Sequence, residues 1–230
     1  CKKHNLKLIV DNTFSPLSVS PIMLGADVVI HSLTKFINGS SDTVGGVYCA
    51  SQEFVDDTKN VNNGACMLLG PTMDSFRSAS ILKNLRTLHI RMKKHSENAM
   101  FLAERFENDG LKVKYPGLKS HKNHELMKSM MHEEYGFGGL LTVDVGSVEK
   151  ANELMELMQT ENLGYLAVSL GFYKTLFSCS GSSTSSEIPE DERKEMGLSD
   201  GLIRFSIGLD HDIERTYQKM RECMVKTGVL

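Results

Sequence analysis

The chain has 230 residues, of which 40% are hydrophobic and 24% are charged, and its formal net charge is −3. This balance lacks the concentrated basic face of a nucleic-acid-binding protein, and no apolar run reaches the roughly 18–20 residues of a membrane span. The five cysteines are odd in number, far apart and in no metal-like spacing, which predicts thiols in a reducing, cytoplasmic setting. Composition therefore favours a soluble globular protein with neither a nucleic-acid nor a membrane partner.

Short apolar runs alternate with helical stretches at the beginning of the chain. Strands are predicted at 6–11, 26–32 and 45–50. Such continuous apolar runs are typical of strands that are buried on both faces of a largely parallel sheet. Between the first two strands, residues 16–25 have room for a short crossover helix that ends at Gly25.

The second half of the chain has a different pattern. A long helical stretch is predicted from Met73 to Asp109, with Gly110 as its stop. Beyond it, the predicted strands cover 111–115, 138–145 and 201–207, and the predicted helices cover 149–159 and 212–226. The Ser-rich segment 178–187 predicts a loop. Together these elements indicate a smaller α+β domain that is attached through the long helix.

Polar residues follow the first two predicted strands at the point where each ends. Asp11 ends the first strand, and Ser32, Thr34 and Lys35 follow the second. Ligands bind at the carboxyl edge of open α/β sheets. There a lysine can form a Schiff base with a phosphorylated pyridine aldehyde, an aspartate can keep the ring nitrogen protonated, and hydroxyls can bond the phosphate. On spacing alone a solvated lysine and a turn-capping aspartate remain open alternatives.

Several segments, taken in chain order, carry a family resemblance. They read VDNTF (10–14), LGADVVIHSLTKF (24–36), GSSDTVGG (39–46), AVSLG (167–171) and DGLIRFSIGLD (200–210). These segments resemble the lysine-bearing signature and C-terminal motifs of the Cys/Met-metabolism pyridoxal-phosphate (PLP) enzymes. The resemblance implies an α/β chain of the PLP-dependent transferase fold type I, which is aspartate-aminotransferase-like. Residues 1–90 would be the C-terminal part of the large mixed-sheet, PLP-binding domain, and 91–230 the C-terminal small α+β domain.

The resemblance also implies how the cofactor is bound. Lys35 would hold pyridoxal 5'-phosphate as a Schiff base and then move protons at the substrate carbons. Asp11 would pair with the ring nitrogen, and Ser32 and Thr34 would hydrogen-bond the phosphate. His31, beside the lysine, is interpreted as a packing residue.

The implied substrate residues lie in the second half of the chain. Arg204 would grip the substrate α-carboxylate, because a guanidinium offers a bidentate fork. Ser169 would lie near the same carboxylate, and Thr184 near the substrate pocket. Arg204 as a structural ion-pair residue and Ser169 as a simple strand end are the alternatives. The histidines in 121–124 lack a third ligand, so no metal site is predicted.

Within the family, residues 64–75, 121–141 and 169–187 are most similar to plant-type methionine γ-lyases. The implied function is that of a carbon-sulfur lyase, which performs α,γ-elimination of L-methionine to methanethiol, 2-oxobutanoate and ammonia. Lys174 and Ser185 depart from the family pattern and leave the contribution of their loop to substrate choice open.

Two alternatives to this reaction remain. A cystathionine γ-synthase or γ-lyase, or an O-acetylhomoserine sulfhydrylase, would share the same motifs. A truncated, non-catalytic oligomerisation module is the non-enzyme alternative. Retention of Asp11, Lys35 and Arg204 together argues against that module, because a scaffold has no physical need for all three.

The chain opens at Cys1 without a Met, on what reads as the tail of one element. We therefore expect it to be the C-terminal portion of a longer protein. The resemblance places an aromatic that stacks on the ring, a Gly-containing phosphate loop and an arm from a neighbouring subunit upstream of Cys1. The chain alone is then expected to be inactive, and the whole protein to be a homo-oligomer, a dimer of dimers, acting on a small sulfur amino acid.

Overall fold

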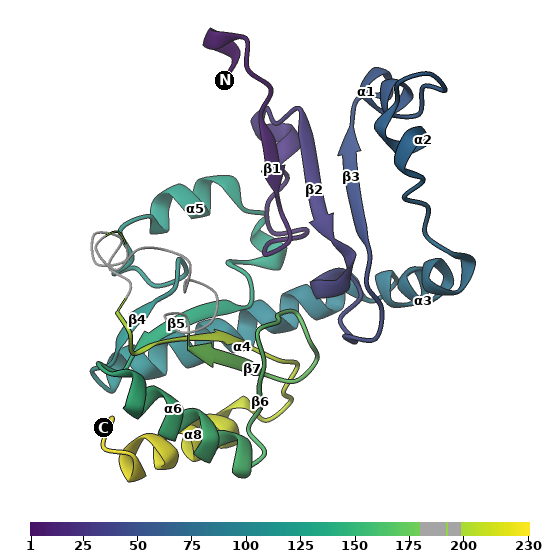
Figure 1. Cartoon of the computed structure of the whole chain (residues 1–230). Coiled ribbons are helices and arrows are strands. Elements are labelled where there is room, and N and C mark those ends of the chain that lie inside the picture. Colours follow the sequence, from purple (N-terminus) through teal and green to yellow (C-terminus); the bar gives the residue numbers. More distant parts are fainter. Residues whose placement is uncertain (180–191, 193–198) are drawn as a thin grey trace.

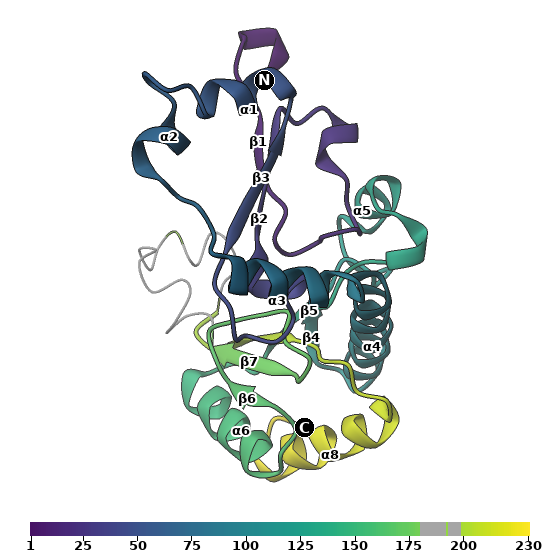
Figure 2. The ribbon, with the colours of Figure 1, turned by 90° about the vertical axis from the view of Figure 1, so that its right-hand side faces the viewer.

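The computed structural model describes residues 1–179, 192 and 199–230, so Thr184 and Ser185 lie outside the described residues. It contains a three-stranded sheet from the first part of the chain and a five-stranded sheet from the second. Figure 1 shows the two sheets one above the other, and in Figure 2 helix α3 lies between them, with α4 beside the five-stranded sheet. No helix within the described part of the chain is long and apolar enough to cross a membrane.

The elements have the following bounds. The strands are β1 (Ile9–Asp11), β2 (Val28–Ser32), β3 (Gly46–Ala50), β4 (Lys112–Lys114), β5 (Leu140–Asp144), β6 (Tyr165–Leu166), β7 (Leu176–Cys179) and β8 (Leu202–Ser206). The helices are α1 (Gln52–Thr58), α2 (Ala65–Leu69), α3 (Ser75–Leu85), α4 (Leu88–Asn108), α5 (His124–Met130), α6 (Val148–Thr160) and α8 (Ile213–Lys226). Short 3-10 turns cover Lys2–His4, Pro21–Leu24 and Glu133–Tyr135, and a π-helical turn covers Leu33–Ile37.

The three-stranded sheet has the order β1-β2-β3. Strands β1 and β2 are parallel, as predicted, but β3 runs antiparallel to β2 with Ser32 opposite Gly46. A parallel β3 would need a crossover back to the other end of the sheet. The chain instead makes the π-helical turn at the carboxyl end of β2 and returns from there. The expected burial on both faces is also wrong for this chain, since Ile9 is 56% exposed and Ile30 39%.

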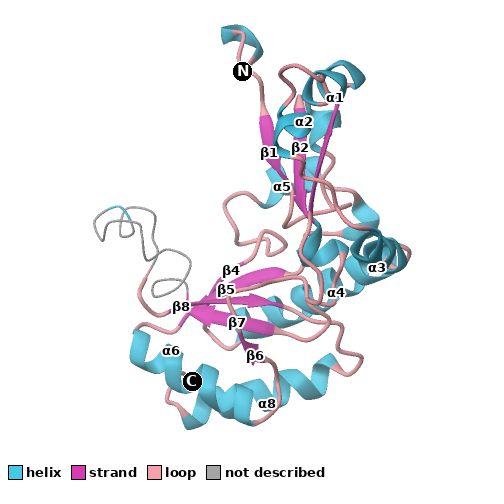
Figure 3. Cartoon of the chain, turned by 45° about the vertical axis from the view of Figure 1, so that its right-hand side comes forward, coloured by secondary structure: helices cyan, strands magenta, loops and turns pink. Residues whose placement is uncertain are grey.

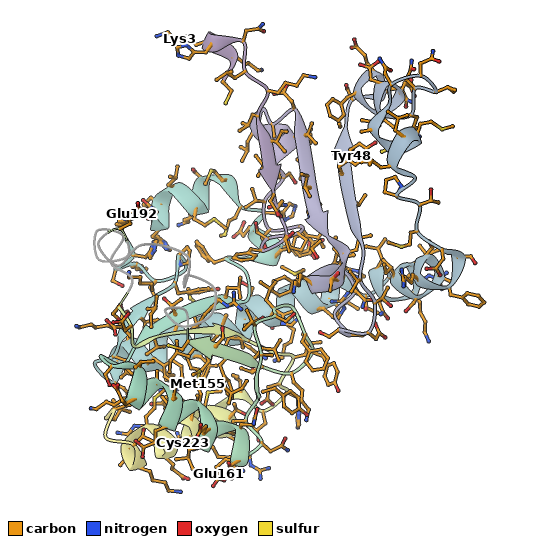
Figure 4. The ribbon with its side chains drawn as sticks, viewed as in Figure 1. Lys3, Tyr48, Met155, Glu161, Glu192 and Cys223 are labelled. Atoms are coloured by element: carbon orange, nitrogen blue, oxygen red, sulfur yellow. The ribbon has the colours of Figure 1, made fainter. Side chains whose placement is uncertain are left out.

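The five-stranded sheet has the order β4-β5-β8-β7-β6, and only its β6–β7 pair is parallel. Helices α4, α6 and α8 pack on one face of this sheet and form the main core with residues such as Phe106, Met155, Phe205 and Cys223. Figure 3 shows α6 and α8 along one side of the sheet, and Figure 4 shows Met155 and Cys223 on these two helices. The opposite face is therefore free to carry polar residues.

The single long helix predicted from Met73 to Asp109 is interrupted. Helix α3 ends at Leu85 and α4 begins at Leu88, because Thr87 has the non-helical dihedrals φ −105° and ψ 3°. The predicted stop is correct, since Gly110 has φ 85°. The crossover segment contains one 3-10 turn that ends at Gly25 with φ 95°, as expected. The short helices α1 and α2 and the strands β6 and β7 were not predicted.

A second, smaller core joins the two sheets. Its buried members are Phe36, Ile37, Ile81, Leu88, Met92 and Leu170. The predicted domain division between residues 90 and 91 falls in the first turn of α4 and stays a prediction. Whatever the domain bounds, the apolar side chains that follow Lys35 pack directly against residues from the second half of the chain.

Helix α4 also binds the chain that follows β8 through polar side chains. The imidazole of His95 is fully buried, and its Nδ1 lies 2.6 Å from the carbonyl oxygen of Ile207. Asn98 donates to the carbonyls of Gly208 and Asp210, each at 2.9 Å. Burial lowers the pKa of His95 to about 4, so the ring is neutral near neutral pH.

We predict that His95 makes the protein sensitive to mild acid. The pKa of the folded state lies below the ordinary 6.5, so the unfolded state binds more protons between pH 6.5 and 4 and stability falls as the pH drops through that window. The expected loss is roughly 3 kcal/mol. Urea unfolding of the wild type and of His95→Gln at several pH values would measure it. Equal slopes of unfolding free energy against pH in both proteins would contradict the prediction.

Candidate functional site

Lys35 lies in the π-helical turn that follows β2. Its dihedrals, φ −88° and ψ −129°, interrupt the helical run within Leu33–Ile37. The turn is closed by bonds from Asn38 N to Leu33 O at 2.9 Å and from Gly39 N to Lys35 O at 2.7 Å. Because Phe36 is fully buried in the smaller core, the backbone beside Lys35 is anchored.

The Lys35 amine meets two residues from the second half of the chain. Its Nζ donates to Ser169 Oγ at 2.9 Å, and Arg204 Nη2 donates to the Ser169 carbonyl oxygen at 3.1 Å. Burial, and next the positive charge of Arg204, lower the pKa of Lys35. A lowered pKa increases the fraction of neutral amine, the form that attacks a carbonyl carbon. The structure thus brings together the predicted nucleophile and both described substrate residues.

Asp11 lies at the carboxyl end of β1 and is bonded to the residue two positions later. Its Oδ1 accepts from Thr13 Oγ1 at 2.6 Å and from Thr13 N at 2.9 Å. The bond from the Thr13 side chain, and next the bond from the Thr13 amide, lower the pKa of Asp11. Thr13 Oγ1 in turn accepts from Ser32 N at 2.8 Å, which ties the end of β1 to the end of β2. The sequence reasoning missed Thr13, although the Asp-Asn-Thr sequence carries an Asx-turn signal that could have identified it.

The two predicted phosphate ligands differ in their contacts. Ser32 is half-buried and is fixed through its backbone amide to Thr13. The Thr34 hydroxyl accepts from Gly45 N at 3.1 Å and donates to Gly45 O at 3.4 Å, so it also holds the segment that enters β3. The phosphate-binding role of both hydroxyls stays a prediction.

Arg204 lies in β8, with Thr142 of β5 and Ser178 of β7 directly opposite it. Cross-strand partners share a face, so these three residues form a row on the face away from the main core. Burial lowers the pKa of Arg204. Among the described residues, no carboxylate lies within ion-pair distance of this guanidinium. Within that part of the chain, the guanidinium binds the Ser169 carbonyl oxygen, and its role toward a substrate carboxylate stays a prediction.

Gly171 brings the Ser169 loop onto the Lys35 turn. It has φ +74°, and a Cβ atom built on it would lie 2.3 Å from Phe36 N and 2.7 Å from Phe36 Cα. Its amide donates to Ser206 Oγ at 2.9 Å, which anchors the loop to β8. Only glycine allows the two backbone segments to approach this closely.

Arg91 of α4 fixes the Lys35 turn from the other side. Its guanidinium donates to the Phe36 carbonyl and, at 2.8 Å, to the Ile37 carbonyl. It also donates to Asn84 O and Thr87 Oγ1 at 3.1 Å each, and so bridges the break between α3 and α4. Sequence reasoning missed Arg91, because nothing local to a helical arginine indicates which distant carbonyls it binds.

The remaining histidines do not join this cluster. His31 lines an apolar cavity of about 400 Å³, and burial lowers its pKa, which favours a neutral packing role. His124 begins α5, where its Nδ1 lies 2.9 Å from Pro116 O and its ring stacks on Phe137. Within the described residues, no three His, Cys, Asp or Glu side chains are grouped so that they could hold a metal ion.

Comparison with known proteins shows the family. The model of the Cys/Met metabolism PLP-dependent enzymes matches residues 1–217. Methionine gamma-lyase from Arabidopsis thaliana is 43% identical over 225 residues, which cover 97% of this chain and 51% of that protein. Cystathionine gamma-lyase from Bacillus subtilis is 38% identical, with 91% of this chain and 54% of that protein covered. The chain belongs to the Cys/Met metabolism PLP-dependent enzyme family, and it spans about half the length of these curated relatives.

Solved structures confirm the fold. A cystathionine gamma synthase from Xanthomonas oryzae pv. oryzae superposes with a TM-score of 0.87 at 32% identity, covering 100% of this chain and 58% of that one. A cystathionine gamma-lyase from Lactobacillus plantarum gives a TM-score of 0.85 at 25% identity, with 99% and 58% covered. The predicted α/β, fold type I class is therefore correct.

The family also establishes the cofactor, pyridoxal 5'-phosphate. The residues present fit it: a half-buried amine of lowered pKa, an aspartate that two hydrogen bonds keep ionised, and a strand end that is fixed beside that aspartate. Lys35, Asp11 and the end of β2 therefore have the chemical properties that binding this cofactor requires.

We predict that Gly171→Ala destabilises the protein by roughly 2–4 kcal/mol, because the added methyl group meets backbone atoms and φ is positive. Gly110→Ala is the matched control, since Gly110 has φ +85° with nothing within 4 Å of a built Cβ. It should cost only about 1 kcal/mol. Equal changes in unfolding free energy for the two variants, measured by urea titration, would argue against the close approach.

We also predict that Arg204→Met raises the pKa of Lys35, because the positive charge that lowers it is removed. The measurement is the pH dependence of competitive acetylation of Lys35, read by peptide mass spectrometry. The acetylation midpoint should move to higher pH in the variant. The exposed Arg77→Met variant should leave it unchanged. An unshifted midpoint in Arg204→Met would show that the two side chains are not coupled.

Proposed function

We propose that the whole protein is a PLP-dependent carbon-sulfur lyase that performs α,γ-elimination of L-methionine. With water, this reaction yields methanethiol, 2-oxobutanoate and ammonia. The observation that carries the proposal is the Lys35 amine, which is held at 2.9 Å from Ser169 Oγ while Arg204 helps to lower its pKa. The similarity to the Arabidopsis methionine gamma-lyase, 43% over 97% of this chain, favours methionine as the substrate.

Each residue of the cluster then has a task. When bound, the cofactor supplies an electron sink for negative charge that develops at the substrate carbons. Lys35 removes the proton from Cα and then helps to remove one from Cβ, after which methanethiol leaves from Cγ. Arg204 binds the α-carboxylate through its bidentate fork. Ser169, bonded to the Lys35 amine and the Arg204 guanidinium, keeps the amine close to that carboxylate.

The residues at the strand ends support the cofactor. Lys35 would hold it covalently through its amine until the amine of the substrate displaces Lys35, which is then free to move protons. Asp11 would pair with the ring nitrogen, and Ser32 and Thr34 would bond the phosphate. An ionised Asp11 favours a protonated ring, since opposite charges at short distance stabilise each other. The lowered pKa of Asp11 supports this assignment.

A γ-replacement reaction is the second candidate, and the fold similarity to a cystathionine gamma synthase favours it. Such an enzyme joins an activated homoserine to a thiol. The two reactions share the early proton transfers at Cα and Cβ and differ in what then happens at Cγ. They are therefore separated by substrate rather than by the residues named above.

We further propose that the protein assembles as a homo-oligomer, a dimer of dimers. Helices α2 and α3 support this proposal, because they carry exposed apolar side chains that include Leu69 at 81% and Phe76 at 88%. Sedimentation equilibrium of the whole protein would give the mass of the assembly.

The function is tested by incubating the whole protein with PLP and L-methionine alone. We predict release of methanethiol and 2-oxobutanoate, and a loss of roughly 10²–10⁴-fold in Lys35→Ala, because proton transfer by a positioned side chain contributes that much. Lys226→Ala, which removes an exposed lysine of α8, is the control. No methanethiol from methionine, together with product from an activated homoserine and a thiol, would reject the lyase in favour of γ-replacement.

A further inference from the structure

Thr13 connects the residues of the candidate site that lie at the two strand ends. Its side chain is almost fully buried, with 8% exposure. Its Oγ1 lies 2.6 Å from Asp11 Oδ1 and 2.8 Å from Ser32 N, and its own amide lies 2.9 Å from the same Asp11 oxygen. One hydroxyl therefore contacts both the aspartate of β1 and the backbone of β2.

The direction of these bonds follows from the groups involved. The Ser32 amide can only donate, so Thr13 Oγ1 accepts from it. The single hydroxyl proton of Thr13 is then available for Asp11, whose ionised carboxylate can only accept. Both bonds to Asp11 end on Oδ1, which leaves Oδ2 as the oxygen to face a ligand.

We propose that Thr13 is a positioning residue, which acts through Asp11 to recognise the ring nitrogen of the cofactor. Its hydroxyl holds the exposed Asp11 carboxylate in one orientation, so that Oδ2 is directed toward the nitrogen. Through Ser32 it also fixes this carboxylate relative to the turn that bears Lys35. The inference rests on the proposed role of Asp11 and adds the residue that orients it.

Part of the structural role at this strand end is filled by Asn12, the neighbour of Thr13. Asn12 N donates to Ile30 O at 2.8 Å, and Asn12 Nδ2 donates to Val19 O at 2.9 Å. These bonds end β1 and hold the segment that follows it without help from the Thr13 hydroxyl. The proton of the Thr13 hydroxyl goes to Asp11, whereas its oxygen accepts from Ser32 N, so loss of the hydroxyl acts on the carboxylate and on the tie to β2.

The first test needs no cofactor. The chain is labelled with ¹³C at aspartate carboxyl carbons, and the Asp11 signal is titrated in the wild type, in Thr13→Val and in Thr13→Ser. Valine matches threonine in shape and lacks the hydroxyl, whereas serine keeps it. We expect the pKa of Asp11 to rise toward its ordinary value in Thr13→Val and to stay low in Thr13→Ser. If the pKa of Asp11 in Thr13→Val equalled that in the wild type, the proposal would be overturned.

The second test uses the whole protein and two ligands, PLP and an analogue in which carbon replaces the ring nitrogen. We expect Thr13→Val to weaken binding of PLP roughly tenfold, as for loss of one hydrogen bond to a charged group, and to leave binding of the analogue unchanged. Thr13→Ser should restore PLP affinity. An equal loss for both ligands would show a general distortion and would reject a role toward the nitrogen.

Asp11→Asn separates this inference from the assignments on which it rests. If the variant still prefers PLP over the analogue, the role of Asp11 itself fails. If Asp11→Asn loses the preference while Thr13→Val keeps it, only the role of Thr13 fails. Because these measurements record binding and not turnover, their outcome does not depend on whether methionine is the substrate.

Discussion

One face of helix α4 holds both halves of the candidate site in place. Arg91, His95 and Asn98 are spaced by four and three residues, so they project from the same side of the helix. Arg91 binds the carbonyls of Phe36 and Ile37 beside Lys35, while His95 and Asn98 bind carbonyls just beyond the strand of Arg204. Helix α4 thus holds the turn that bears the Lys35 amine in a fixed position relative to the strand that bears the Arg204 guanidinium.

The acceptors in this arrangement are backbone carbonyls, which every residue type provides. The side chains that bind them are buried at a cost, visible in the lowered pKa values of Arg91 and His95. That cost is partly offset by the hydrogen bonds that both side chains make to backbone carbonyls. The scaffold therefore tolerates changes in the side chains that face substrate, which suits a family whose members differ in the reaction they catalyse.

The sequence predicted the places of β1, β2 and the polar residues that follow them well, because their signals are local: apolar runs and a polar strand end within residues 10–46. The direction of β3 was not predicted, because it depends on the direction in which the chain emerges from the turn after β2. Arg91 and Thr13 were missed for related reasons. The acceptors of Arg91 lie 55 and 54 residues away, and the hydroxyl of Thr13 bonds an amide 19 residues away. Thr184 lies outside the described residues, so its role near the substrate pocket stays a prediction.

The contact between Gly171 and Phe36 limits how this protein can be recombined with its relatives. Two main-chain segments that approach this closely with no side chain between them must match in shape, and trimming a side chain cannot relieve a mismatch between them. A chimaera that takes the Lys35 turn from one parent and the Ser169 loop from another would keep every named functional residue. Its Lys35 turn and its Ser169 loop would nevertheless not match in shape where they meet. Productive crossovers should therefore leave residues 36 and 171 together, from a single parent.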